Sequence, residues 1–138
     1  MSAVAIYFRL GEVIVVPQGG GGGHFIAIEP ILIVPPVADD VQTAVIEGLS
    51  VSARSEYADK PPKGWKSPVL KRFGIRSYKA FAADATLCFV FEDAGALEVE
   101  RWQRARDGRG FEQSPEGASP LDGPHEIGTA VLQALRVS

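Results

Sequence analysis

The sequence predicts an α+β fold in which an antiparallel sheet is built from two β-then-α halves and helices pack on the sheet. The main observation is an approximate internal repeat, because residues 41–52 align without a gap to residues 127–138. In both copies the apolar residues recur at helical spacing, and apolar strand-like runs precede both copies. The identical pairs are Thr43/Thr129, Ala44/Ala130, Val45/Val131, Leu49/Leu135, Val51/Val137 and Ser52/Ser138. Chance similarity between two helices of common residues is the alternative explanation.

The length of 138 residues is enough to bury one hydrophobic core without disulfides. We therefore expect a single domain over residues 1–138. Its halves are expected at about 1–54 and 75–138, joined by a connection rich in Pro and Lys.

The first half is expected to begin with a β-hairpin and a third strand. Residues 3–8 and 12–16 are apolar and β-branched on either side of a short turn, and Pro17 is expected to end the second strand. The third strand is expected from 25 to 34, where Pro30 indicates an edge position or a bulge.

A run of five glycines, residues 19–23, separates the second strand from the third. A phosphate-binding loop is the alternative, but Gly-Lys-Ser/Thr is absent and a strand-like segment follows the glycines. We therefore expect a mobile hairpin tip. After the third strand, Asp39 or Asp40 is expected to cap a helix over 40–53.

A short helix is expected to open the second half. Ser67 and Pro68 have the pattern of an N-cap followed by Pro at the first helical position, and Gly74 is well placed as a left-handed stop. The predicted helix covers 69–73, and a strand is expected at 77–82.

A second hairpin is expected at 86–92 and 97–102, because two apolar runs flank the turn-forming Asp-Ala-Gly. In its second strand the apolar and acidic residues alternate, which predicts one core face and one presented face. Residues 103–123 have few apolar anchors and predict a surface loop broken by a short strand at Phe111. The repeat helix then closes the chain at about 125–136.

Composition favours a cytoplasmic protein. The lone Cys88 lies in an apolar strand and has no partner for a disulfide, which fits a reducing compartment. The N-terminus lacks a signal-peptide pattern, and no apolar run is long enough to span a membrane. We expect no membrane partner. The oligomeric state cannot be read from the sequence.

The candidate catalytic residues do not form a recognisable constellation. His24 and His125 could meet as an acid–base pair, but a loop histidine and a solvated helix-start histidine are the favoured interpretation. Cys88 lacks the electropositive setting of a reactive thiol, and no His/Cys/Asp/Glu cluster has ligand spacing. We predict that the protein is not an enzyme and binds no metal or cofactor.

Residues 54–79 combine eight Lys/Arg with aromatic rings, a mixture that single-stranded nucleic acid favours. The candidate nucleic-acid-binding residues are Lys63, Trp65, Lys66, Lys71, Arg72 and Tyr78. The net charge of −3 opposes phosphate binding, so a solvated linker with Trp65 folded back on the core is the favoured interpretation and nucleic acid is an unlikely partner.

Short motifs in both halves carry a family resemblance. They are Arg76-Ser77-Tyr78 with Phe81, the end of the first repeat helix at residues 49–52, and the matching end at 135–138. In this order the chain resembles the immunity proteins (CdiI type) of bacterial contact-dependent growth inhibition toxin–immunity systems. The glycine run and the Arg-rich 101–109 segment depart from that pattern.

The resemblance implies a small cytoplasmic antitoxin that binds and neutralises the C-terminal toxin domain of a delivery protein, commonly a nuclease. An acidic surface would suit the basic substrate groove of a nuclease. The candidate toxin-binding residues are Glu92, Asp93, Glu98, Glu100 and Trp102. A single-stranded nucleic-acid-binding module that uses the 54–79 segment is the alternative function.

Overall fold

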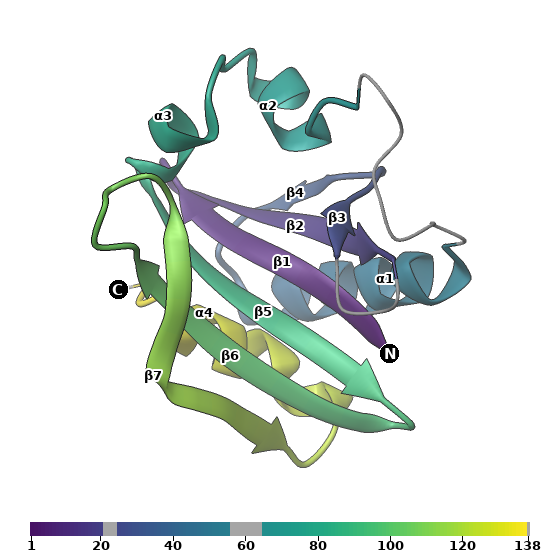
Figure 1. The fold of residues 1–138 in the computed structure, drawn as a ribbon. Coiled ribbons are helices and arrows are strands. Elements are labelled where there is room, and N and C mark those ends of the chain that lie inside the picture. Colours follow the sequence, from purple (N-terminus) through teal and green to yellow (C-terminus); the bar gives the residue numbers. More distant parts are fainter. Residues whose placement is uncertain (21–24, 56–64, 138) are drawn as a thin grey trace.

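The computed structural model describes residues 1–20, 25–55 and 65–137, and it confirms the predicted α+β class. A seven-stranded antiparallel sheet has the order β3-β2-β1-β5-β6-β7, with β4 also paired to β2, and four helices pack against it. In chain order the elements are β1 (Ser2–Arg9), β2 (Glu12–Gly19), β3 (Ile26–Ala27), β4 (Leu32–Val34), α1 (Ala38–Arg54), α2 (Pro68–Phe73), α3 (Tyr78–Ala82), β5 (Ala85–Asp93), β6 (Ala96–Arg104), β7 (Phe111–Leu121), a 3₁₀ turn η1 (Pro124–Glu126) and α4 (Ile127–Ala134). Helices α1 and α4 lie on one face of the sheet, and α2 and α3 lie on the other (Figure 1).

Each half contributes one tight hairpin to the centre of the sheet. The β1–β2 turn has Leu10 at φ 49° and Gly11 at φ 82°, and the β5–β6 turn has Ala94 at φ 50° and Gly95 at φ 85°. Two consecutive positive φ angles match the right-handed twist of the flanking strands, which is why such turns favour Gly. The two hairpins meet where β1 pairs antiparallel with β5.

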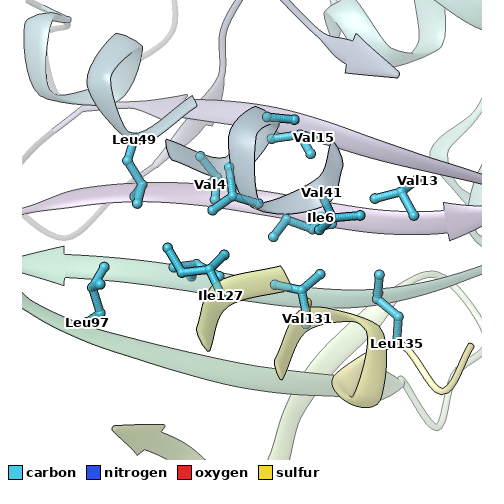
Figure 2. Close-up of a cluster of buried hydrophobic side chains, with 14 residues drawn as sticks. Val4, Ile6, Val13, Val15, Val41, Leu49, Leu97, Ile127, Val131 and Leu135 are labelled. Atoms are coloured by element: carbon cyan, nitrogen blue, oxygen red, sulfur yellow. The ribbon is translucent and has the colours of Figure 1, made fainter. Parts of the chain in front are cut away.

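The repeat helices bury the predicted stripes in one shared core. Helix α1 packs over β1 and β2, and α4 packs beside α1 over β5 and β6. The stripe residues are at most 5% exposed, and Figure 2 shows both stripes directed toward the strand side chains of the same cluster. They are Val41, Val45 and Leu49 in α1 and Ile127, Val131 and Leu135 at α4. The helical spacing of these residues is therefore confirmed, and whether the two halves superpose remains a prediction.

Two hydroxyl groups join the ends of these helices to the sheet. The Oγ of Ser52 accepts a hydrogen bond from the Ala3 N–H at 3.0 Å and donates to the Gln18 carbonyl at 2.6 Å. The Oγ1 of Thr86 donates to the Leu135 carbonyl at 3.0 Å. Buried polar groups need such partners, so these bonds fix where each helix ends on the sheet.

The second face carries a separate core under α2 and α3. Side chains alternate along β1, so Val4 and Ile6 face α1 while Ala5 and Tyr7 face the other way. The second cluster consists of Ala5, Tyr7, Ile14, Val16, Val69, Phe81, Ala85 and Leu87. Because the central strands are covered on both faces, their sequences are continuous apolar runs rather than alternating ones.

Arg104 of β6 holds the C-terminal end of α3 in place. Its guanidinium donates to the carbonyl oxygens of Ala82 at 2.9 Å, Ala83 at 2.7 Å and Ala85 at 3.3 Å. The last carbonyls of a helix have no partner within the helix, and a cation there is favourable.

The first half differs from the prediction at three points. Strand β2 does not end at Pro17 but continues to Gly19. The Pro17 carbonyl accepts a hydrogen bond from the Ile28 N–H at 2.9 Å, so the backbone polar groups of Pro17 point toward β3. The missing N–H of proline therefore removes no hydrogen bond between β2 and β1. The expected third strand is two short edge strands interrupted around Pro30. The N-cap of α1 is Val37 rather than Asp39 or Asp40, which lie in the first turn.

The second half differs more strongly. Helix α2 is confirmed with Gly74 at φ 64° as its left-handed stop, but 77–82 is a helix rather than a strand. The Ser77 Oγ accepts from the Ala80 N–H at 3.2 Å, which is the N-cap bond that starts α3. The expected 103–123 loop contains the long strand β7, whose exposed edge position needs few apolar residues.

Two predicted features lie outside the described residues. They are most of the glycine run and the larger part of the Pro/Lys-rich connection.

Candidate functional site

The sheet face under α2 and α3 is only partly covered, and a large hollow borders the covered part. This hollow, the basic groove, has a volume of about 990 Å³. Its lining residues are Ala5, Tyr7, Gln18, Phe25, Ile26, Ala27, Trp65, Lys66, Ser67, Val69, Leu70, Lys71, Gly74, Ile75, Arg76, Tyr78 and Phe89. The lining contains three cationic side chains and no acidic one, over a mainly aliphatic and aromatic floor.

A second, smaller hollow of about 400 Å³ opens near the β5–β6 turn. This acidic hollow is lined by Met1, Phe91, Asp93, Ala96, Glu98, Glu100, Gln113 and Ala118. It contains three carboxylates and no cationic side chain. The sheet therefore presents surfaces of opposite charge at these two hollows.

An aromatic strip connects the two hollows. Phe89 lines the basic groove and Phe91 lines the acidic hollow, and their rings stack with centroids 5.6 Å apart and planes 6° from parallel. Phe25 lies 6.4 Å from Phe91, and Trp102 lies 4.8 Å from Phe89. All four rings are half-buried. We call the basic groove, this aromatic strip and the acidic hollow together the open sheet face.

The expectation that Glu100 is a presented carboxylate is wrong. Its side chain is on the expected face of β6, but the residue is only 8% exposed. Its Oε1 accepts a hydrogen bond from the Trp102 indole N–H at 2.6 Å, so the two residues form a supported pair. A buried carboxylate needs such a donor, which makes Glu100 a structural support of the aromatic strip.

The other acidic candidates fall into two groups. Asp93 and Glu98 are exposed beside the acidic hollow, as expected. Glu92 alternates with Cys88 and Val90 along β5, so it lies on the face of α1 and α4 and not with the others.

Four of the six candidate nucleic-acid-binding residues line the basic groove. Trp65, Lys66, Lys71 and Tyr78 line it, and Trp65 is 37% exposed rather than folded into the core. Arg72 lies outside the groove, with its guanidinium 5.8 Å from the Phe73 ring centroid.

Lys63 lies outside the described residues.

Three aromatic residues of the open sheet face were not among the predicted site residues. They are Phe25, Phe89 and Phe91. Arg76, which belongs to the basic segment 54–79, also lines the basic groove. Phe89 and Phe91 alternate within an apolar run, and this spacing places them on one face, but a run buried on both sides has the same pattern. Only the position of α2 and α3 shows that this part of the face is open.

Burial favours the neutral forms of the two tyrosines at the groove and of Cys88, which lies on the other face of the sheet under α1 and α4. The hydroxyl groups of Tyr7 and Tyr78 hydrogen-bond at 2.7 Å, and burial raises the pKa of both above the ordinary value of 10.0. Burial also raises the pKa of the Cys88 thiol, so the nucleophilic thiolate is disfavoured. In the described part of the chain no group of three or more His, Cys, Asp or Glu side chains could hold a metal ion. The described residues of the open sheet face supply apolar and charged contacts.

His125 lies exposed in η1, and His24 is outside the described residues. Among the helices of the described chain, none is long and apolar enough to cross a membrane.

Comparison with known proteins identifies the fold. No protein-family model matches the sequence, and no curated protein is significantly similar to it. Among solved structures, the chain resembles the "Protein of Unknown Function NMB0488 from Neisseria meningitidis", with a TM-score of 0.74 and 16% identity over 98% of this chain and 93% of that one. It also resembles a chain of the CdiA-CT/CdiI toxin and immunity complex from Yersinia pseudotuberculosis, with a TM-score of 0.69 and 13% identity over 98% of this chain and 95% of that one.

These similarities cover nearly the whole chain in both directions. The fold is CdiI-like, and the resemblance stated from the sequence motifs is confirmed at the level of the fold.

Proposed function

We propose that this protein is an immunity protein that binds a cognate toxin domain of a contact-dependent growth inhibition system and neutralises it. The observation that carries the proposal is the chain-long likeness in fold to a chain of a toxin and immunity complex. The open sheet face supports the proposal, because partly exposed aromatic rings flanked by charged groups are typical of protein–protein contacts. The protein acts by binding the toxin, without catalysing a reaction and without a cofactor. It meets the toxin in the cytoplasm of the target cell.

The toxin contact is proposed on the open sheet face. Phe91 and Trp102 supply large, pre-ordered apolar surface, since each is held by neighbouring rings or by Glu100. Side chains that are already ordered lose little conformational entropy on binding. Asp93 and Glu98 add charge at the rim of this surface.

The toxin is proposed to be a nuclease whose active groove is blocked by this face. Nuclease grooves carry basic side chains that contact phosphates, so the acidic hollow complements them. Asp93 and Glu98 steer the encounter, and Glu100 acts by holding Trp102. Glu92 is omitted from this contact because it lies on the opposite face of β5.

A viability assay with the toxin domain encoded beside this gene tests the proposal. Cells that express the toxin should survive when the wild-type protein is co-expressed and die without it. Asp93→Lys combined with Glu98→Lys should slow association and reduce its salt sensitivity, because rim charges act mainly on the on-rate. The matched control is Asp40→Lys combined with Glu47→Lys, which makes the same charge change at exposed positions of α1. Equal death with and without the wild-type protein would show that the immunity proposal is wrong.

A further inference from the structure

The basic groove has an excess of positive charge that the described residues do not neutralise. Lys66, Lys71 and Arg76 are exposed at its rim, and none lies within ion-pair distance of a described carboxylate. An adjoining hollow shares Lys66 and Lys71 and contains Arg54 together with a single acid, Glu29. Cations therefore dominate this side of the open sheet face.

The floor of the groove is suited to an apolar side chain. Val69, Leu70 and Ile75 line it together with Ala5 and Ala27, so much of the lining is aliphatic. Transfer of an apolar side chain from water into such a hollow is favourable because it removes apolar surface from water. An apolar group with adjacent negative charge would satisfy both floor and rim.

The aromatic rings of the groove are less suited to stacking on bases. The Phe89 ring is already occupied by Phe91 on one side and Trp102 at 4.8 Å. Tyr78 is half-buried, and its hydroxyl is engaged by Tyr7 at 2.7 Å. Sequence-independent binding of single strands needs successive free ring faces, and here Trp65 is the most accessible ring. These contacts favour a peptide segment over a nucleic acid.

We propose that the basic groove takes an acidic segment of the toxin that carries a large apolar anchor residue, while the acidic hollow takes a basic part of the same toxin. This inference rests on the proposed immunity function and adds the chemistry of the partner surface. The opposite charges at the two ends of the aromatic strip fix the orientation of the toxin, because the reversed orientation would place like charges together.

The first test is binding of the purified toxin domain to a charge-reversal variant, Lys71→Glu combined with Arg76→Glu. The association rate constant should fall about tenfold or more, and its dependence on salt should weaken. The control is Lys79→Glu combined with Arg109→Glu, which changes the net charge equally at exposed positions outside the groove. The control should bind like the wild type. Thermal melts of all variants check that the fold is retained.

The second test locates the acidic segment directly. Zero-length carboxyl-to-amine cross-linking of the wild-type complex should join Lys66 or Lys71 to an Asp or Glu of the toxin. Mass spectrometry would then identify the segment, and replacement of its apolar residue by Ser should weaken binding.

The outcomes separate the two proposals. If the wild-type protein binds no toxin, the immunity function and this inference fail together. If the wild type binds and protects but the Lys71/Arg76 reversal binds like the control, only the inference fails. The inference also fails if a uridine oligonucleotide binds the wild type and competes with the toxin while no lysine cross-link to the toxin forms, because the groove would then be a nucleic-acid site.

Discussion

Gly128→Ala should destabilise the protein although Ala is ordinarily the better helix former. A Cβ at position 128 would overlap the Ala38 carbonyl oxygen and lie 2.7 Å from its carbon, whereas carbon atoms in contact prefer about 3.5–4.0 Å. The neighbour is backbone and cannot rotate away. The same junction holds Gln42, whose amide nitrogen donates to the carbonyl oxygens of Pro124 at 3.1 Å and His125 at 2.9 Å in its satisfied orientation.

The expected magnitude follows from two opposing effects. Overpacking against fixed atoms costs about 3 kcal/mol, at the upper end of the usual range. The higher helix propensity of Ala returns at most about 1 kcal/mol, so the net loss is about 2 kcal/mol. For a domain of this size that loss corresponds to a melting temperature lower by about 8 °C.

Urea unfolding monitored by circular dichroism measures this loss. Thr129→Ala is the matched control, because Thr129 is exposed in the same turn of α4 and its replacement should change stability by less than about 0.5 kcal/mol. Gly48→Ala should fall between the two, since its Cβ would lie 2.8 Å from the Val4 Cγ1, a side-chain atom that can move. A Gly128→Ala variant as stable as the wild type would refute the described contact of α4 with α1.

Three further changes test other parts of the fold. Val45→Asp and Val131→Asp should each lower the free energy of unfolding by more than about 3 kcal/mol, because each buries a charge in the core. The two losses should agree within about 1 kcal/mol, because the residues occupy equivalent places in the two halves. Very different losses in urea unfolding would argue against the repeat. Above about pH 10 the tyrosines ionise in the unfolded chain while Tyr7 and Tyr78 stay neutral in the native protein, so the free energy of unfolding should decrease with rising pH. The double variant Tyr7→Phe with Tyr78→Phe should show a smaller decrease when unfolding is measured with denaturant at alkaline pH. Arg104→Lys should lower the free energy of unfolding by about 1–2 kcal/mol, because an ammonium group cannot donate to three carbonyl oxygens with the geometry of the guanidinium. An unchanged melting temperature would mean that these hydrogen bonds do not stabilise the fold.

Local patterns were sufficient to predict the parts of the fold that depend on local interactions. The stripes of α1 and α4 follow from apolar spacing, and the hairpin at residues 93–95 follows from a Gly that the turn requires at φ 85°. Helix α2 follows from a Pro at its first position and a Gly at its end. In each case the responsible residues are neighbours in sequence.

The errors arose where tertiary position decided the structure. Strand β7 has few apolar residues because it is an edge strand with a bulge at residues 114–117, and an exposed edge reads as a loop. Helix α3 replaces the strand expected at 77–82, because the Ser77 side chain accepts a hydrogen bond from the Ala80 N–H and so caps the start of a helix. Of the four acidic candidates, Asp93 and Glu98 are exposed beside the acidic hollow, whereas Glu92 lies on the other face of β5. The burial of Glu100, which pairs with Trp102 of the same strand, could not be predicted from alternation along β6.

The dissociation constant of the purified toxin domain for the wild type and for Phe91→Ser tests the central claim most directly. If the open sheet face buries a standard interface of roughly 1,600 Å² with good anchors, the wild type should bind at about 10 nM or better. Phe91→Ser should weaken binding about 30-fold, as expected for an anchor worth about 2 kcal/mol. Ile46→Ser is the matched control, because Ile46 is a 44% exposed apolar residue of α1 on the opposite face, and its affinity should stay within about twofold. Equal affinity of Phe91→Ser and wild type, or no binding by the wild type at micromolar concentration, would contradict the claim that this face neutralises a toxin.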